Sequence, residues 1–164
     1  MEMILLAALL TLAPDAPLED LQSFADACVR HDNCSELAAI AWTESGFHRI
    51  KKRSGKGACC YMGILGSRYD NPSCDALEAD PYLCVDLGAK KVAGWKKSCG
   101  KSGLDGYNGG WQGCWSRPPK NADDKRCKGQ CDSYTRKVRR FQKKIETAMA
   151  SLEEWQRRKG DDHE

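Results

Sequence analysis

Cysteine is the residue that most constrains how this chain can fold. The sequence contains 10 cysteines among 164 residues, an even number spread over most of its length. They are Cys28, Cys34, Cys59, Cys60, Cys74, Cys84, Cys99, Cys114, Cys127 and Cys131. Zinc sites commonly combine paired C-x-x-C units, and the sequence contains none of these. The pattern therefore predicts disulfides and an oxidising compartment such as the periplasm, the cell surface or the extracellular space.

Spacing favours two local disulfides, although ten cysteines allow very many connectivities. The loops of Cys28–Cys34 and Cys127–Cys131 are short enough for each pair to close on itself. Cys59 and Cys60 are adjacent in the sequence, so we expect them to bridge to different partners. The remaining pairings cannot be derived from spacing.

Length and charge bound the classes of protein to which the chain can belong. A chain of 164 residues suits one domain with a modest core, and we expect a monomer. The formal net charge is +3, from 26 Lys and Arg against 23 Asp and Glu, which is too mild and too mixed to predict nucleic-acid binding. It is compatible with an anionic partner such as a bacterial cell wall. No stretch is long enough for a typical membrane-spanning helix.

The first 16 residues form an apolar segment whose role the sequence leaves open. The run from Met3 to Ala13 has the length of a signal-peptide core, but no Lys or Arg precedes it and Pro14 follows the obvious cleavage point. It can be a removed signal, a tether that makes transient membrane contact, or an apolar start packed on the domain. We expect the folded domain to span residues 17–158 and residues 159–164 to form a charged tail.

Hydrophobic periodicity predicts a mainly α domain with irregular loops. The expected helices cover residues 17–31, 34–44, 81–97 and 133–158. The expected loops cover residues 48–60, 100–115 and 116–131, and the second of these has six glycines in sixteen residues. In the last helix apolar residues recur at steps of three and four as far as Trp155, which predicts one buried face opposite a solvated basic face.

Glu44 occupies a position where a charge is unfavourable. On a helix it falls between Leu37, Ile40 and Ala41, which form an apolar stripe. Ser45 and the glycine after it end the helix, so the carboxyl also faces the negative end of the helix dipole. Both effects predict a raised pKa for Glu44, as a general acid requires. The alternative is a glutamate that bends out to solvent.

Four short stretches, spread over about a hundred residues, add to this observation on Glu44. They are TESGF (43–47), GACCYMGI (57–64), YNGG (107–110) and SYTRKVRRF (133–141). In this order they resemble the motifs of the soluble lytic transglycosylases, a branch of the goose-type-lysozyme-like fold. That family carries a catalytic Glu followed by Ser, a Gly-x-x-Gly-Leu-Met-Gln loop, Tyr-Asn-Ala-Gly, and a late Tyr that opens a helix. The resemblance spans most of the chain.

The second motif departs from the family pattern. Cys60 stands where the family has Gly, Tyr61 where it has Leu, and Gly63 where it has Gln, whereas Met62 is retained. We expect the missing Gln at position 63 to remove one substrate contact without touching the acid itself.

The resemblance implies a lysozyme-like helical domain that cleaves the β-1,4 bond between N-acetylmuramic acid and N-acetylglucosamine. Such enzymes act without water and leave a 1,6-anhydromuramic end. Glu44 would be the single acid and base, with peptidoglycan glycan strands as substrate and no cofactor or metal. The setting would be periplasmic or extracellular, as a wall-remodelling enzyme or as a phage endolysin acting on the host periplasm.

The resemblance also implies roles for five further residues, each with a structural alternative. Tyr107 would contact the acid or the scissile sugar, and Tyr134 would face the acid; either can be an ordinary packed aromatic. Asn108 would bind an acetamido group or hold a turn. Ser45 would touch substrate or serve as a helix-end hydroxyl. Met62 would line the sugar groove or pack in the core.

Three other functions remain compatible with the sequence. A hydrolytic muramidase on the same fold needs a second carboxylate to activate water, for which Asp105 and Asp70 are the candidates. A disulfide-rich module can bind cell wall without catalysis. A zinc protein would use the cysteines as ligands instead of bonding them to one another.

Overall fold

Helices account for most of the structure, as the sequence predicts. The computed structural model describes residues 1–49, 57–67, 70–99, 103–114 and 131–161. Within them the elements are α1 (Glu2–Leu12), α2 (Leu18–Cys28), α3 (Cys34–Ser45), β1 (Ala58–Cys59), β2 (Ile64–Leu65), α4 (Cys74–Ala79), α5 (Pro81–Cys99), α6 (Gly103–Cys114) and α7 (Cys131–Asp161). Helix α4 and both strands were not predicted.

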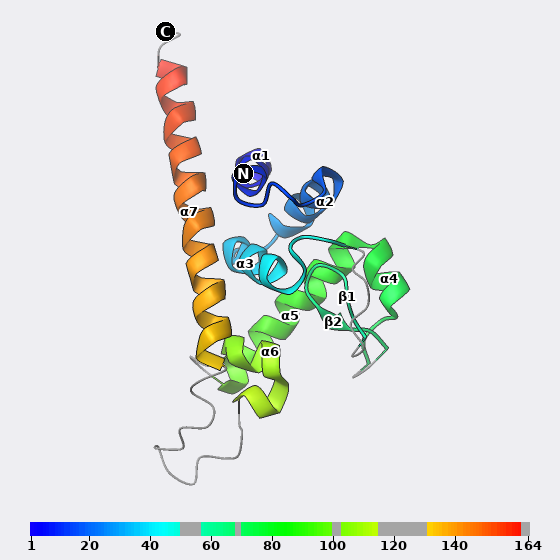
Figure 1. Cartoon of the computed structure of the whole chain (residues 1–164). Helices are drawn as coiled ribbons and strands as arrows, with labels where there is room; N and C mark the ends of the chain where they lie inside the picture. Colours follow the sequence, from blue (N-terminus) through cyan, green and yellow to red (C-terminus); the bar gives the residue numbers. More distant parts are fainter. Residues whose placement is uncertain (50–56, 68–69, 100–102, 115–130, 162–164) are drawn as a thin grey trace.

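Helix α3 is the buried helix of the fold, with α2, α5 and α7 in contact with it (Figure 1). Every residue from Leu37 to Ala41 is fully buried. A helix that is apolar on all sides has to be covered by its neighbours. The helix ends at Gly46, which takes a left-handed φ of 63° and whose N–H donates to the Trp42 carbonyl oxygen over 3.0 Å. The predicted C-terminal boundary is therefore confirmed to within one residue.

Helix α1 packs on the rest of the fold. Leu5 and Leu9 are buried, and the helix contacts α2 and α7. Of the three interpretations of the first 16 residues, packing on the domain is the arrangement in the structure. The outer side of α1 exposes Met3 and Leu10. Among the described residues, no helix combines the length and the apolarity needed to cross a bilayer.

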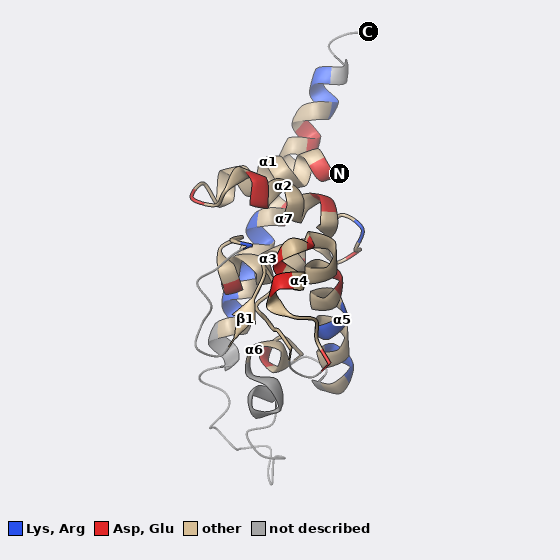
Figure 2. Cartoon of the chain, turned by 90° about the vertical axis from the view of Figure 1, so that its right-hand side faces the viewer, with Lys and Arg blue, Asp and Glu red and all other residues tan. Residues whose placement is uncertain are grey.

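Helix α7 changes character along its length. Val138, Phe141 and Ile145 are buried on the side that contacts α1 and α3. The C-terminal part projects beyond the other elements (Figures 1 and 2). Trp155, in this part, is 55% exposed. The predicted buried face is therefore wrong at this end. The helix also continues to Asp161, so part of the expected tail is helical, while residues 162–164 lie outside the described part.

The glycine-rich stretch predicted to be a loop is instead the helix α6. Each glycine weakens a helix by roughly 1 kcal/mol relative to alanine, so local propensity opposes this structure. Packing favours it, because α6 contacts α5 and α7 and buries Leu104. A Cβ at Gly103 would lie 2.7 Å from the Lys96 Cα, so the glycine permits close approach of two helices. The polar connection predicted for residues 116–131 lies almost entirely outside the described residues.

The two strands form a small antiparallel hairpin beside α4. Their register pairs Ala58 with Leu65 and Cys59 with Ile64. Strand β1 lies at the end of the predicted loop 48–60, and residues 50–56 of that loop lie outside the described part. The turn between the strands covers residues 60–63, with Tyr61 and Met62 fully buried at its tip. The tip of this hairpin therefore inserts into the core.

Three disulfides join described parts of the chain. They are Cys28–Cys34, Cys59–Cys74 and Cys60–Cys84. The first confirms the predicted local pair, and the other two confirm that the adjacent cysteines bridge to different partners. The other four cysteines, including the predicted pair Cys127–Cys131, have side chains outside the described part. These disulfides indicate an oxidising, non-cytoplasmic environment.

Candidate active site

Glu44 lies in the last turn of α3 with a half-buried side chain. Its three predicted apolar neighbours, Leu37, Ile40 and Ala41, are fully buried. The left-handed cap at Gly46 turns the chain away directly after it. The carboxyl group is therefore held between the dry centre of the fold and the surface, where contacts with other elements decide its environment.

Tyr134 donates a hydrogen bond to this carboxyl group. The distance from its hydroxyl oxygen to Glu44 Oε1 is 2.7 Å, and it links α3 with the beginning of α7. Burial raises the pKa of the Tyr134 hydroxyl far above its usual range, and the negative charge of Glu44 raises it further. Tyr134 consequently remains a neutral O–H donor at any physiological pH.

Gly63 closes the other side of the carboxyl group. A Cβ built on this residue would lie 2.7 Å from Glu44 Oε2 and 3.1 Å from the carboxyl carbon. Its φ is 62°, which also favours glycine. The expectation that position 63 does not touch the acid is therefore wrong. A glutamine side chain would collide with the carboxyl group as it is placed in this chain.

Tyr107 fastens the hairpin turn to α6. Its hydroxyl donates to the carbonyl oxygen of Met62 over 2.6 Å. Burial raises the pKa of Tyr107 well above its usual value, and the charge of Glu44 contributes, so the two side chains lie within electrostatic reach of each other. The charge of Glu44 thus reaches Tyr107, whose hydroxyl is bonded to the backbone of the turn.

Three of the other predicted site residues occupy structural or peripheral places. Ser45 is buried, and its hydroxyl lies 2.9 Å from the Ala41 carbonyl oxygen and 3.0 Å from that of Tyr61. The Met62 side chain has no exposed surface, so it packs in the core instead of lining a groove. Asn108 is exposed on α6, one residue after Tyr107.

The two candidates for a second carboxylate differ in their surroundings. Asp105 is 8% exposed, and its Oδ1 accepts a hydrogen bond from the Thr135 hydroxyl, which ties α6 to α7. Asp70 is exposed in a turn and has a φ of 60°. A base that activates water needs access to water. The burial and the bond to Thr135 place Asp105 among the groups that hold the fold.

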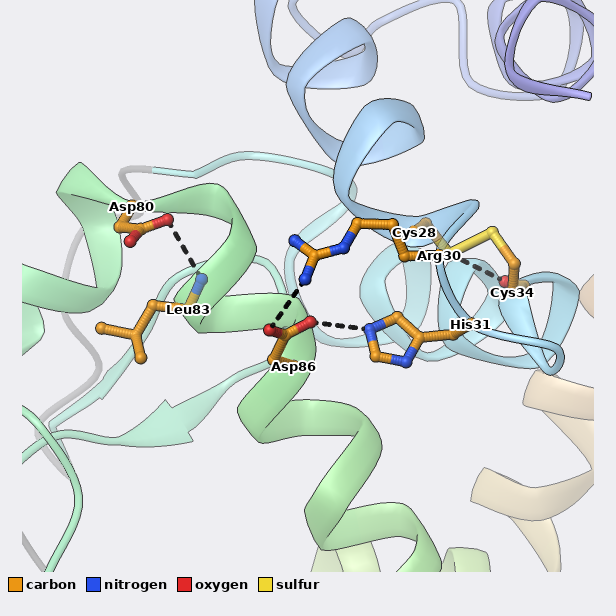
Figure 3. A network of polar contacts seen from close by, with 7 residues as sticks. All are labelled: Cys28, Arg30, His31, Cys34, Asp80, Leu83 and Asp86. Atoms are coloured by element: carbon orange, nitrogen blue, oxygen red, sulfur yellow. Dashed lines mark hydrogen bonds and ion pairs between the residues drawn. A yellow bond between two sulfur atoms is a disulfide. The ribbon is translucent and has the colours of Figure 1, made fainter.

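A second polar cluster lies away from Glu44, where Asp86 of α5 meets the connection between α2 and α3 (Figure 3). Its Oδ1 lies 2.8 Å from His31 Nε2, and its Oδ2 lies 3.7 Å from an Arg30 nitrogen. A His–Asp pair can orient a general base for a nucleophile. The neighbouring sulfurs of Cys28 and Cys34 are bonded to each other, so neither supplies a thiolate. This cluster links α5 with the connection between α2 and α3.

One group of described side chains has the geometry of a metal site. Donor atoms of Cys59, Cys74 and Glu78 lie within 4.8 Å of one another. The two sulfurs form a disulfide, however, and zinc binds thiolates. The Cys59–Cys74 disulfide therefore joins the hairpin to α4.

The arrangement around Glu44 can exchange a proton with a bound molecule. One half-buried carboxyl group accepts a hydrogen bond from a tyrosine hydroxyl at one oxygen, and a turn that leaves no room for a Cβ at Gly63 lies beside the other. Of the residues that sequence reasoning missed, Gly63 is the most informative. A glycine at the end of a turn can indicate a close approach of the backbone to another group. The sequence pattern, however, did not indicate that this group lies on α3.

The site is assembled from four segments that are far apart in the sequence. They come from α3, from the β1–β2 turn, from α6 and from the beginning of α7 (Figure 1). Each segment contains one of the four stretches singled out from the sequence. Comparison of this chain with protein-family models, with curated proteins and with solved structures found no match.

Proposed function

We propose that this chain is a peptidoglycan lytic transglycosylase with a lysozyme-like fold. Its substrate is the β-1,4 bond between N-acetylmuramic acid and N-acetylglucosamine, and its product has a 1,6-anhydromuramic end. Glu44 is the single acid and base. The observation that carries the proposal is the hydrogen bond from Tyr134 to Glu44, which joins two of the four motif stretches across 90 positions of the sequence.

The surroundings of Glu44 suit both halves of such a reaction. Burial against the apolar stripe and the negative end of α3 favour the protonated acid. Glu44 gives this proton to the glycosidic oxygen while the bond from that oxygen to C1 breaks. The Tyr134 hydroxyl then stabilises the carboxylate, because a donated hydrogen bond favours the charged form.

The second half of the reaction returns the proton. The C6 hydroxyl oxygen of the muramyl residue attacks C1, and its proton passes to the Glu44 carboxylate. Atoms balance without water, so no second carboxylate is needed. This agrees with the placement of Asp105, whose side chain is buried and bonded to Thr135. General acid–base catalysis of this kind contributes about 10²–10⁴-fold in rate.

The cellular setting follows from the disulfides and from the substrate. Three disulfides suit a protein that works in the periplasm or outside the cell, where glycan strands are found. A wall-remodelling enzyme and a phage endolysin both act there, as a monomer on the glycan strand. The exposed side of α1, with Met3 and Leu10, is a surface for transient membrane contact.

The experiment that tests the proposal is mass spectrometry of muropeptides after digestion of purified sacculi. Wild-type protein should release products with anhydro ends, which are one water lighter than reducing ends. Glu44→Gln should release none. The matched control is Glu146→Gln, which changes another carboxyl group at the α3–α7 contact, where it accepts from the Ser35 hydroxyl over 2.9 Å.

Each alternative function predicts a different result in the same experiment. Reducing ends that disappear with Glu44→Gln would indicate a hydrolytic muramidase. Intact sacculi with tightly bound wild-type protein would indicate a non-catalytic wall-binding module. Equal digestion by wild type and Glu44→Gln would remove Glu44 from the mechanism.

A further inference from the structure

Cys60 adopts a backbone conformation that residues with a side chain rarely take. Its φ is 55°, in the left-handed region that glycine occupies without strain. Cys60 also opens the hairpin turn, since the Gly63 N–H donates to its carbonyl oxygen over 3.3 Å. The dihedral angle of Cys60 therefore sets the direction in which residues 61–63 leave strand β1.

A disulfide attaches this residue to α5. The side chains of Cys60 and Cys84 are 2% and 0% exposed, and their Cα atoms are 6.3 Å apart. Helix α5 also supports Met62, because a Cβ at Gly88 would lie 2.7 Å from the Met62 Cγ. The turn is thus held on α5 at two nearby points, one covalent and one apolar.

The far end of the same turn lies against the acid. Gly63 has no side chain, and it lies so near Glu44 that a Cβ built on it would be 2.7 Å from Oε2. Only Tyr61 and Met62 separate it from Cys60, and both are packed in the core. A change in the φ of Cys60 would therefore displace the backbone that lies beside the carboxyl group.

We propose that the Cys60–Cys84 disulfide is a positioning element of the active site, which holds Cys60 in the left-handed conformation and thereby keeps Gly63 against Glu44. The inference rests on the proposed function, in which Glu44 is the acid and base. Cys60 touches no reacting atom in this scheme. It acts through the turn on the placement of the carboxyl group.

The chain contains a matched control for this disulfide. Cys59–Cys74 starts one residue earlier in the same hairpin and joins it to the beginning of α4. Both disulfides close loops of moderate length, with sequence separations of 15 and 24, so their effects on the unfolded chain should be similar. Cys59 lies in strand β1 and is not among the residues with a positive φ. Its disulfide therefore stabilises the fold without setting the turn.

Two substitutions at position 60 distinguish a role in the backbone conformation of the turn from a role in packing the core. Both are made with Cys84→Ala, so the disulfide is absent in each. Cys60→Ala keeps a Cβ and leaves the smaller void, and a packing role predicts that it is the better variant. Cys60→Gly leaves the larger void but accepts the left-handed φ without strain. The positioning proposal therefore predicts the opposite order.

We expect Cys60→Ala with Cys84→Ala to lower kcat about tenfold or more on sacculi, at a temperature where the variant is folded. Cys60→Gly with Cys84→Ala should recover most of kcat while its Tm stays below that of the wild type. Cys59→Ala with Cys74→Ala should lower Tm and leave kcat within about twofold. Equal or lower kcat for the glycine variant, or an equal loss of kcat in the Cys59–Cys74 control, would overturn the proposal.

A readout without turnover keeps this test independent of the proposed function. The ¹³C chemical shift of the Glu44 carboxyl carbon at a fixed pH reports its surroundings even if the protein cleaves no glycan. The shift should change in the alanine variant and return toward the wild-type value in the glycine variant. If the alanine variant does not fold, the glycine variant is compared directly with the wild type, and a displaced Glu44 shift there contradicts the proposal.

Discussion

Helix α3 carries two glutamates with different described contacts. Near its N-terminal end Glu36 is 3% exposed, and its Oε2 lies 2.5 Å from the Lys96 Nζ of α5. At its C-terminal end Glu44 accepts from the neutral Tyr134 hydroxyl. A cation stabilises the ionised form of its partner permanently, whereas a neutral donor also tolerates a carboxyl group that gives and takes a proton. In the proposed reaction the Glu44 carboxyl group has to change its charge, whereas the Glu36 carboxylate only has to keep its ion pair with Lys96.

The largest expected effect separates the two glutamates by activity. Glu44→Gln should lower the release of muropeptides by about 10²–10⁴-fold, because it removes the group that transfers the proton. Glu36→Gln should keep activity within a few-fold at a temperature where it is folded. Initial rates on labelled sacculi measure both. Comparable losses in the two variants would remove the distinction between them.

The ion pair between Glu36 and Lys96 should contribute to the stability of the fold. Lys96→Met leaves the Glu36 carboxylate buried without its cation, which costs up to about 3–5 kcal/mol in a fully buried pair. Because Lys96 is 41% exposed, we expect a smaller loss, about 2 kcal/mol of the free energy of unfolding. Glu36→Gln should cost less, since it removes the buried charge itself. Denaturant unfolding of both variants checks this order, and a greater loss for Glu36→Gln would contradict it.

Removal of the Tyr134 hydroxyl tests the contact of Glu44 at the C-terminal end of α3. Tyr134→Phe keeps the ring and deletes only the hydroxyl that donates to Glu44 Oε1. Hydrogen bonds to charged groups contribute about 1.5–3 kcal/mol, so kcat should fall roughly tenfold or more. Tyr82→Phe is the control, because its hydroxyl donates to Asp26 on an exposed part of the surface. Unchanged kcat in Tyr134→Phe would show that the hydrogen bond has no part in the reaction.

The smallest expected effect is a difference in alkaline stability. The pKa of Tyr134 is raised in the folded protein above its usual value of 10.0, so its contribution is fully present below pH 10 and is lost as the unfolded chain ionises above it. At pH 10.5 this loss is about 0.8 kcal/mol for one such tyrosine. Tyr134→Phe should therefore lose less stability than the wild type between pH 8 and 10.5. Parallel curves of unfolding free energy against pH would contradict this.

Several features of the fold and the site were predictable because they depend on local pattern. The helix that ends at Gly46 follows from an apolar run and a glycine cap, and it places Glu44 where the stripe predicts. The local disulfide Cys28–Cys34 follows from a short loop. The hydrogen bond between Tyr134 and Glu44 was anticipated only through the motif resemblance, since nothing in the spacing of two residues 90 apart indicates contact.

The errors share a physical cause, which is that tertiary packing outweighs local preference. Helix α6 forms despite its glycines because they allow close contact with α5, as at Gly103 and Lys96. Trp155 is exposed although it continues the apolar pattern of α7, because the helix projects beyond the other elements. Gly63 was interpreted as a missing side chain, whereas the structure leaves no room for a Cβ between this residue and the acid. None of these three features follows from a periodic pattern in the sequence.

The sequence by itself determined the helical class, the oxidising environment and the choice of Glu44 as the unusual acid. These depend on composition and on the period of a single helix, which a short window of sequence contains. The tertiary structure decided that the Tyr134 hydroxyl donates to Oε1 of that acid and that Gly63 lies near Oε2. It decided both because the surroundings of a half-buried carboxyl group depend on segments that only the folded chain brings together.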